Sequence, residues 1–254
     1  RRVAKFGSDE GNLWKCVYRA DSRNIDPGNI GPDSDDKVFP YALKENEGTF
    51  EEAAAQLKNF ILNVSQLNDE DFYKWIQRVC DVELLLKTYA VNVALGMWDD
   101  HWNNSNNFYI YFNSNSSKDY KFFFIPYDYD NTLGTSHVCG AQTDSGRHDP
   151  YDWGNHGILI ERLMKYDDFR EIYRAELMRM IDPSNGFMDY DSAVARIRDW
   201  HSRIQGMTSN DTGDGMEIKD RPASWGNHPE YRLLDPDPNV NFFKVKAETI
   251  KKMK

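Results

Sequence analysis

The 254-residue sequence has few cysteines, no long apolar run and a deficit of positive charge. Its three cysteines, Cys16, Cys80 and Cys139, lie far apart, which excludes a zinc site built on paired cysteines and a dense disulfide framework. One disulfide bond or three free thiols both stay open. No apolar stretch approaches the roughly 18 to 20 residues of a membrane-spanning helix. Because 31 Lys and Arg face 41 Asp and Glu, the net charge of −10 disfavours nucleic acid as the main ligand and favours metal ions or basic proteins.

The composition is nevertheless that of a folded protein, with 40% hydrophobic and 14% aromatic residues. The first forty residues predict one or two short strands and a surface loop. A capping box at Thr49 and Glu52 opens the first predicted helix. Apolar residues at helical spacing predict further helices that begin near Asp69, run from Val82 to about Met97, and cover residues 158–165, 169–181, 191–204 and 242–254. With no repeat or composition shift, we expect one domain over residues 1–254, α+β and mostly α.

Two aromatic runs flank a polar turn at residues 113–119 and predict a β-hairpin, with strands near residues 108–112 and 120–126. Hairpin strands run antiparallel about 5 Å apart, so the residues before the first strand meet the residues after the second. Polar side chains occupy both places. We therefore expect two groups to lie close together: Asp99, Asn104 and Asn107 before the hairpin, and Asp128 and Asp130 after it.

Carboxylate and amide oxygens of this kind are ligands for a hard cation such as Mg²⁺ or Mn²⁺. The interval from Asp99 to Asn104 is also that of a kinase catalytic loop, in which the Asp orients the attacking hydroxyl while the Asn and a distant Asp hold the metal. The flanking residues differ from an ordinary protein kinase. Met97-Trp98-Asp99 replaces His-Arg-Asp, and Asp128-Tyr129-Asp130 stands in the place of Asp-Phe-Gly.

Other interpretations have to be weighed. Asp and Asn gather in solvated turns for local backbone reasons, although the hairpin and the second acidic cluster favour a site. Asp128, Asp130 and Thr132 also fit the Asp-x-Asp-x-Thr motif of haloacid-dehalogenase-type phosphatases, with the first Asp as nucleophile. That fold requires strands alternating with helices after the motif, where only helices are predicted here. A third alternative is a non-catalytic surface or adhesion module. No histidine is assigned as a ligand, including His101, His137, His148 and His156.

The sequence resembles the spore coat protein H (CotH) family of atypical protein kinases over roughly residues 11–204. The resemblance is carried by Gly11-Asn12-Leu13-Trp14-Lys15, by Trp98-Asp99 with Asn104, Asn107, Phe108 and Tyr109, by the run from Pro126 to Gly134, and by Gly157-Ile158-Leu159-Ile160-Glu161-Arg162-Leu163. It implies transfer of phosphate from ATP to Ser or Thr of a protein, with Mg²⁺ or Mn²⁺. It also implies a secreted, cell-surface or spore-coat setting, although residues 1–5 lack the apolar core of a secretion signal.

The resemblance assigns roles to individual residues. Asp99 becomes the catalytic Asp, Asn104 a metal ligand, and Asp128 the counterpart of the Asp in Asp-Phe-Gly. Asn107 and Asp130 are the next candidate metal ligands, and Asp128 and Asp130 are not separated by sequence alone. The excess of acid favours a basic, Ser-containing protein substrate, while the oligomeric state stays open.

The sequence departs from a complete kinase in one respect. It has no Gly-rich phosphate loop and no Val-Ala-x-Lys strand, and nothing before residue 11 supplies an ATP-clamping Lys with a Glu partner. We therefore expect a protein-kinase-like helical C-terminal lobe with an inserted aromatic hairpin that carries the metal-site loop, and an N-terminal lobe largely absent from this chain.

Overall fold

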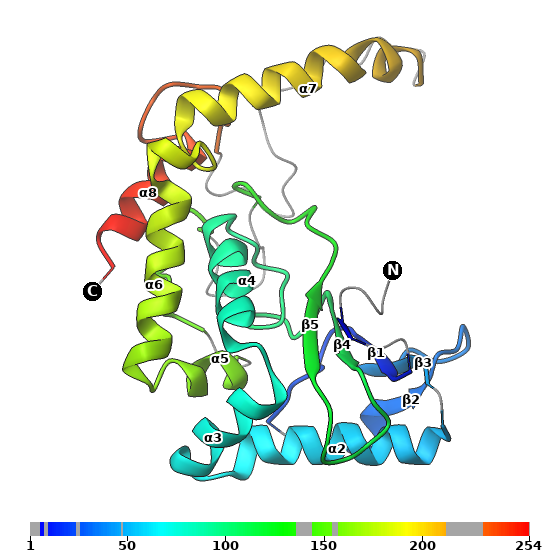
Figure 1. Cartoon of the computed structure of the whole chain (residues 1–254). Coiled ribbons are helices and arrows are strands. Elements are labelled where there is room, and N and C mark those ends of the chain that lie inside the picture. Colours follow the sequence, from blue (N-terminus) through cyan, green and yellow to red (C-terminus); the bar gives the residue numbers. More distant parts are fainter. Residues whose placement is uncertain are drawn as a thin grey trace. The chain divides into compact units, whose positions relative to one another are not determined.

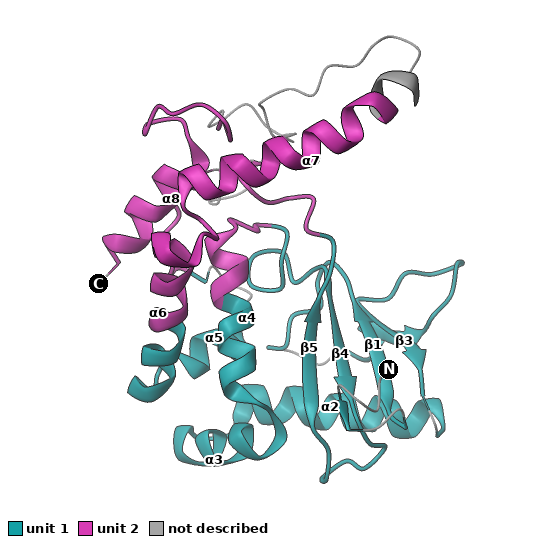
Figure 2. Cartoon of the chain, turned by 45° about the horizontal axis from the view of Figure 1, so that its top comes forward, with its two compact units in different colours: residues 1–89, 99–128, 153–173 teal, residues 90–98, 129–152, 174–254 magenta. Residues whose placement is uncertain are grey.

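A computed structural model describes residues 6–7, 10–23, 26–46, 48–135, 144–153, 157–211 and 231–253, without the side chains of 208–211 (Figure 1). The chain forms two compact units (Figure 2). Unit 1 comprises residues 1–89, 99–128 and 153–173, and unit 2 comprises residues 90–98, 129–152 and 174–254. Cys16 and Cys80 are buried free thiols, whereas Cys139, His137 and His156 lie outside the described residues.

Unit 1 is built on a five-stranded sheet of order β2-β3-β1-β4-β5. Its strands are β1 (Asn12–Cys16), β2 (Ile30–Pro32, after the short helix η1 at Pro27–Asn29), β3 (Tyr41–Glu45), β4 (Phe108–Phe112) and β5 (Phe122–Pro126). All neighbours pair antiparallel except β2 and β3, which are parallel. β4 and β5 pair where the sequence predicts a hairpin, with Phe108 opposite Pro126 and Phe112 opposite Phe122.

The prediction of a helical body with one hairpin is incomplete, because the second edge of β4 pairs with β1. Strand β1 alternates buried and half-exposed residues, so Trp14 and Cys16 enter the core while Lys15 stays on the other face. A five-residue strand is too short for its pattern to reveal its pairing partner. The early strands thus extend the hairpin into a sheet.

Seven α-helices occur in the described chain. They are α2 (Phe50–Gln66), α3 (Asp69–Val79), α4 (Val82–Ala94), α5 (Ile158–Leu163), α6 (Asp167–Ile181), α7 (Tyr190–Asp211) and α8 (Phe242–Lys251), with a short helix η2 (Pro183–Asn185) after α6. The predicted capping box is confirmed, since Thr49 and Glu52 exchange side-chain and backbone hydrogen bonds. Helix α4 ends three residues before the predicted Met97, where Gly96 takes a left-handed φ of +67°.

Helix α2 packs on one face of the sheet in unit 1 (Figure 2). Phe60 lies with its ring centroid 5.4 Å from Phe112 and 4.7 Å from Phe122. The fully buried Gln56 accepts a 2.7 Å hydrogen bond from the Asn12 amide and donates to the carbonyls of Ser114 and Ser116 at 2.7 and 2.6 Å. A buried amide must be satisfied in this way, so Gln56 ties the hairpin tip and β1 to the same helix.

The C-terminal end of α2 is held by Arg162 of α5. Its buried guanidinium donates to the carbonyls of Val64, at 2.7 Å, and Leu67, and lies 4.1 Å from the ring centroid of Phe72. Carbonyls at a helix end lack intrahelical partners, so this cation both caps α2 and joins it to α3 and α5. Arg162 belongs to one of the motifs that carry the sequence resemblance.

Unit 2 contains α7 and α8, and α8 buries a lysine. Lys246 is only 1% exposed, and its Nζ donates to the carbonyl of Ser145 at 2.8 Å. Burial removes water from this ammonium group and so disfavours its charged form. Among the described residues, no helix combines the length and apolarity needed to cross a membrane.

Lys246 leads to a prediction about pH. Burial lowers the pKa of this ammonium group to about 7 from 10.5, although Asp144 and Asp149 oppose the shift. Between these values the unfolded chain carries a proton that the folded protein lacks, so this group makes the free energy of unfolding rise with pH by about 1.4 kcal/mol per unit. In urea titrations from pH 7 to 10, Lys246→Met should remove this contribution and the exposed control Lys252→Met should retain it. An identical pH slope in both variants would contradict a neutral buried lysine.

Candidate functional site

The segment before β4 folds around the carboxylate of Asp99. Asn104 donates to Oδ1 of Asp99 at 2.8 Å, and Asn106 donates to both carboxylate oxygens at 3.1 Å. Asn107 donates to Oδ2 and to the main-chain carbonyl of Asp99, each at 3.0 Å. A carboxylate has about four acceptor positions, and three amide groups fill them here. The orientation of Asp99 is therefore fixed by neighbouring side chains.

Asn107 also connects this segment to the far end of the hairpin. Its carbonyl accepts the Tyr127 N–H at 2.9 Å, one step beyond the last pair of β4 and β5. Tyr127 directly precedes Asp128. A single buried residue thus links the catalytic candidate Asp99 to the residue next to the metal-ligand candidate Asp128, as the hairpin topology predicts.

The backbone of the site adopts uncommon conformations. Ser105, Asn107 and Asp128 have left-handed φ values of 52°, 59° and 61°. Asn and Asp tolerate this region better than most residues, but each instance still costs about 1 kcal/mol or more. Two of them, Asn107 and Asp128, stand at the open end of the hairpin. Asp128 is exposed and has no hydrogen-bond or ionic partner in the described part of the chain.

His101 is buried and attaches the segment before β4 to the aromatic core of unit 1. Its ring stacks on Tyr89 with centroids 5.0 Å apart, meets the edges of Phe108 and Phe124, and its Nε2 lies 3.3 Å from the Tyr89 hydroxyl. Burial lowers the pKa of His101 to about 3, so the ring is neutral. His101 is a structural part of the aromatic core.

A lysine stands beside the site, on the face of the sheet opposite α2. Lys15 faces Tyr109 across β1 and β4, and its Nζ lies 5.5 Å from the ring centroid of Tyr127. Burial raises the pKa of Tyr127, and the Tyr109 phenol, the Cys16 thiol and the carboxylates of Asp128 and Asp99 raise it further. Both carboxylates therefore act on the same phenol. Sequence reasoning found no phosphate-binding lysine, because only the pairing of β1 with β4 brings Lys15 here.

The structure places four of the five candidates, Asp99, Asn104, Asn107 and Asp128, in unit 1. Asp130 belongs to unit 2, where it accepts a 3.0 Å hydrogen bond from the Asn131 amide. The sequence analysis missed Asn106, whose signal was the Asn-Asn-Ser-Asn-Asn run itself. Within the described residues, no three His, Cys, Asp or Glu side chains gather at one point, so a metal here would depend on amide oxygens as well.

The order of elements separates two of the enzyme classes considered. After β5 the described chain forms helices, with one isolated β-bridge between Arg232 and Asn241. The alternation of strands and helices that a haloacid-dehalogenase-type phosphatase requires is not present in those residues. An α+β chain with a five-stranded sheet and seven described helices is instead consistent with a kinase-like fold.

Comparison with known families agrees with this assignment. The family model described as CotH kinase protein matches residues 2–232, so the chain belongs to the CotH kinase family. The resemblance drawn from the motifs is thereby confirmed. A search of curated proteins gave no match.

Two features of Asn107, its amide hydrogen bonds to Asp99 and its left-handed backbone, can be tested by measuring the free energy of unfolding of variants. Asn107→Gly removes the amide but accepts the left-handed φ, so we expect a loss of about 1.5–3 kcal/mol from hydrogen bonds to a charged group. Asn107→Ala should lose about 1 kcal/mol more, because alanine is strained at this φ. Urea denaturation measures both values. Equal stability of the two variants would contradict the left-handed backbone, and an unchanged Asn107→Gly protein would contradict the amide's role.

Because His101 is buried as a neutral ring, we predict that the folded protein loses stability in acid. Its pKa is about 3 in the folded protein and about 6.5 in the unfolded chain, so only the unfolded chain takes up a proton as the pH falls from 6.5 to 3. The resulting loss is about 1.4 kcal/mol per pH unit over this window. His101→Phe keeps an aromatic ring on Tyr89 but does not titrate, so its stability should fall less steeply between pH 6.5 and 4 in urea titrations. The control His201→Phe should retain the full acid loss, and a steep loss in His101→Phe would show that another group causes it.

Proposed function

We propose that this protein is an atypical protein kinase that transfers the γ-phosphate of ATP to Ser or Thr of a protein. Family membership supports a kinase. The observation that carries the proposal is the connection through Asn107, which holds the oriented carboxylate of Asp99 near the end of the hairpin that presents Asp128. This connection supports a phosphoryl-transfer site in which Asp99 would act on the acceptor hydroxyl and Asp128 on the metal.

The residues fit a divalent cation. Asn104 and Asn107 direct their N–H groups at Asp99, and their side-chain oxygens accept no hydrogen bond from any described residue. With the free carboxylate of Asp128, they make the hard oxygen donor set that Mg²⁺ or Mn²⁺ prefers. Asn104 and Asp128 would hold the ion, with Asn107 as a further candidate in the same unit. When bound, the metal supplies positive charge that neutralises the phosphate oxygens.

Asp99 would act on the acceptor hydroxyl. The hydroxyl oxygen of Ser or Thr forms a bond to the γ-phosphorus, the bond from that phosphorus to the bridging oxygen of ATP breaks, ADP leaves, and the hydroxyl proton passes to Asp99 and then to water. Because amide groups fill every acceptor position on Asp99, the hydroxyl must displace one of them. We expect the hydroxyl to displace the Asn106 amide, because this amide is shared between both carboxylate oxygens and Asn106 is not among the proposed metal ligands.

Lys15 would supply positive charge for the phosphates. It belongs to the Gly-Asn-Leu-Trp-Lys motif and has no carboxylate partner within the described chain. In phosphoryl transfer, positioning and charge neutralisation provide nearly all of the catalysis. Lys15 could thus offset part of what a Gly-rich loop and its lysine contribute in ordinary kinases. The substrate we propose is a basic, Ser-containing protein outside the cell or on a spore coat, in keeping with the net charge of −10.

The proposal predicts the behaviour of two carboxylate variants. With γ-labelled ATP, Mg²⁺ and a basic Ser-rich protein as acceptor, Asp99→Asn and Asp128→Ala should each lose label transfer by about 100-fold or more, because one loses the proton acceptor and the other a metal ligand. Asp119→Asn at the exposed hairpin tip is the matched control and should transfer at the wild-type rate. Thermal melts check that all three variants are folded.

The outcomes separate the alternatives. Equal labelling by Asp128→Ala and wild type would overturn the metal-dependent kinase. Partner binding that survives both carboxylate variants, in a protein that transfers no label, would favour the non-catalytic surface module. Metal removal by EDTA should abolish transfer, and added Mg²⁺ or Mn²⁺ should restore it.

A further inference from the structure

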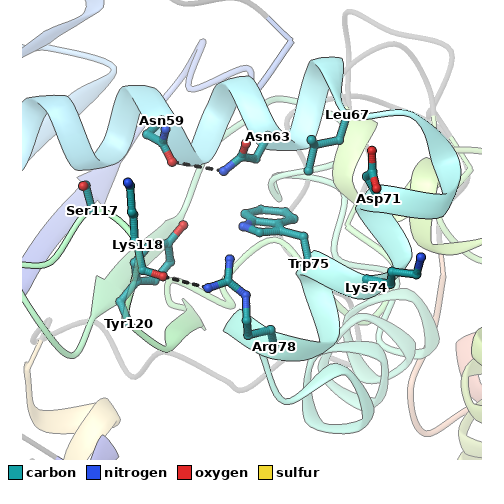
Figure 3. A pocket seen from close by; sticks show the side chains of 10 residues that line it. All are labelled: Asn59, Asn63, Leu67, Asp71, Lys74, Trp75, Arg78, Ser117, Lys118 and Tyr120. Atoms are coloured by element: carbon teal, nitrogen blue, oxygen red, sulfur yellow. Dashed lines mark hydrogen bonds between the residues drawn. The ribbon is translucent and has the colours of Figure 1, made fainter.

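Unit 1 carries a pocket whose lining includes none of the catalytic or metal-binding candidates (Figure 3). It has a volume of about 450 Å³ and lies between α2, α3 and the turn that joins β4 to β5. Figure 3 shows the ring of Trp75 with Asn63 above it and Arg78 below it, Asn59 and Lys118 to the left, and Asp71 and Lys74 to the right.

Two cations that line this pocket, Arg78 and Lys118, form no ion pair in the described chain, although the carboxylate of Asp71 also lines the pocket. Arg78 uses one guanidinium nitrogen to donate to the Lys118 carbonyl at 3.0 Å, and neither Arg78 nor Lys118 has an acidic partner among the described residues. Lys121 adds a third positive charge nearby, since its Nζ donates to the carbonyl of Arg78. By contrast, Lys74 at the far end of the pocket is paired with Glu70. Arg78 and Lys118 are exposed, and cations outnumber carboxylates in the lining, so the pocket is positively charged in a chain of net charge −10.

The backbone contacts of Arg78 and Lys121 have a structural role, because they fasten the hairpin turn to α3. This role uses one N–H of Arg78, whereas a guanidinium has five. It does not involve the Lys118 ammonium at all. The remaining donors are therefore available to a ligand.

The opposite wall offers neutral hydrogen-bonding groups. Asn63 donates to Oδ1 of Asn59 at 3.0 Å, which leaves the Asn59 N–H₂ and the Asn63 carbonyl oxygen without a described partner. Together, the two amides offer one free donor and one free acceptor, which suits the main chain of an extended peptide. The floor is rigid, since Trp75 is 7% exposed and its ring centroid lies 5.6 Å from that of Phe60 and 5.8 Å from that of Phe72.

We propose that this pocket binds a peptide segment carrying a phosphorylated Ser or Thr. Arg78 and Lys118 would take the phosphate, whose charge of about −1.5 to −2 matches two cations better than a single carboxylate does. Asn59 and Asn63 would pair with the peptide backbone, and Trp75 would support the flanking side chain. The source of the phosphate rests on the proposed function, because a kinase of Ser-rich proteins makes such segments; the pocket would then retain a substrate that already carries one phosphate.

Binding of short fluorescent peptides tests the proposal directly, without catalysis. The peptides share one sequence with phosphoserine, Ser or Glu at the central position, and the full-length protein is titrated without ATP or added metal. We expect the phosphoserine peptide to bind at least tenfold more tightly than the other two. Lys118→Ala should weaken it about tenfold, the effect of one charge-assisted hydrogen bond. Lys87→Ala, which removes an exposed helix cation outside the pocket, is the matched control and should bind as wild type.

Three results would overturn the proposal: equal binding of the phosphoserine and Ser peptides, equal binding of the Glu peptide, or equal effects of Lys118→Ala and Lys87→Ala. Arg78→Lys gives a second measurement, because it keeps the charge but loses the planar fork, and it should also weaken the phosphoserine peptide. A melting temperature equal to wild type confirms that Lys118→Ala is folded. Label transfer to an unphosphorylated Ser peptide should be unchanged in Lys118→Ala, so loss of phosphopeptide binding and failure of the proposed kinase activity are observed separately.

Discussion

The side chain and carbonyl of Asn107 form the joint on which the site depends. One amide donates to Asp99 and one carbonyl accepts from Tyr127, so the loop before the hairpin and the turn after it are held by the same residue. The joint is buried, where a hydrogen bond to a charged group is worth more and an unpaired polar group costs more than in water. A carboxylate on a surface loop would ordinarily sample several rotamers; here its orientation is set by three amides.

The rest of unit 1 keeps this joint in place. His101 fixes the loop to the aromatic core, Gln56 fixes the hairpin tip to α2, and Arg162 fixes the end of α2 to α5. Gln56 and Arg162 satisfy buried polar groups of one segment with a side chain from another, whereas His101 acts through ring packing, and all three couple separate segments of the chain. The left-handed conformations of Asn107 and Asp128 are tolerated because these surroundings leave the chain little freedom.

The division of charge across unit 1 gives the two candidate sites opposite characters. The open end of the hairpin carries carboxylate and amide oxygens with Lys15 beside them, which suits a divalent cation and the phosphates bound to it. The pocket between α2 and α3 gathers three cations, two asparagine amides and one carboxylate around an indole, and this excess of cations suits an anion on a peptide. Both sites involve the hairpin, one at its open end and one at its turn, so its rigid attachment matters to each.

Sequence by itself determined the local features of this protein. The Thr49 and Glu52 capping box, the strands around the polar turn and the interval from Asp99 to Asn104 each depend on residues near one another in the chain. The hairpin also follows from local pattern, and with it the expectation that Asp99 and Asp128 lie close together. Tertiary structure alone decided that β1 extends the hairpin and brings Lys15 to the site, that Asn106 shares the Asp99 carboxylate, and that Arg78 and Lys118 meet Asn59 and Asn63. The reason is physical: the direction of an amide or an ammonium group is set by packing between segments far apart in sequence, and no local periodicity records it.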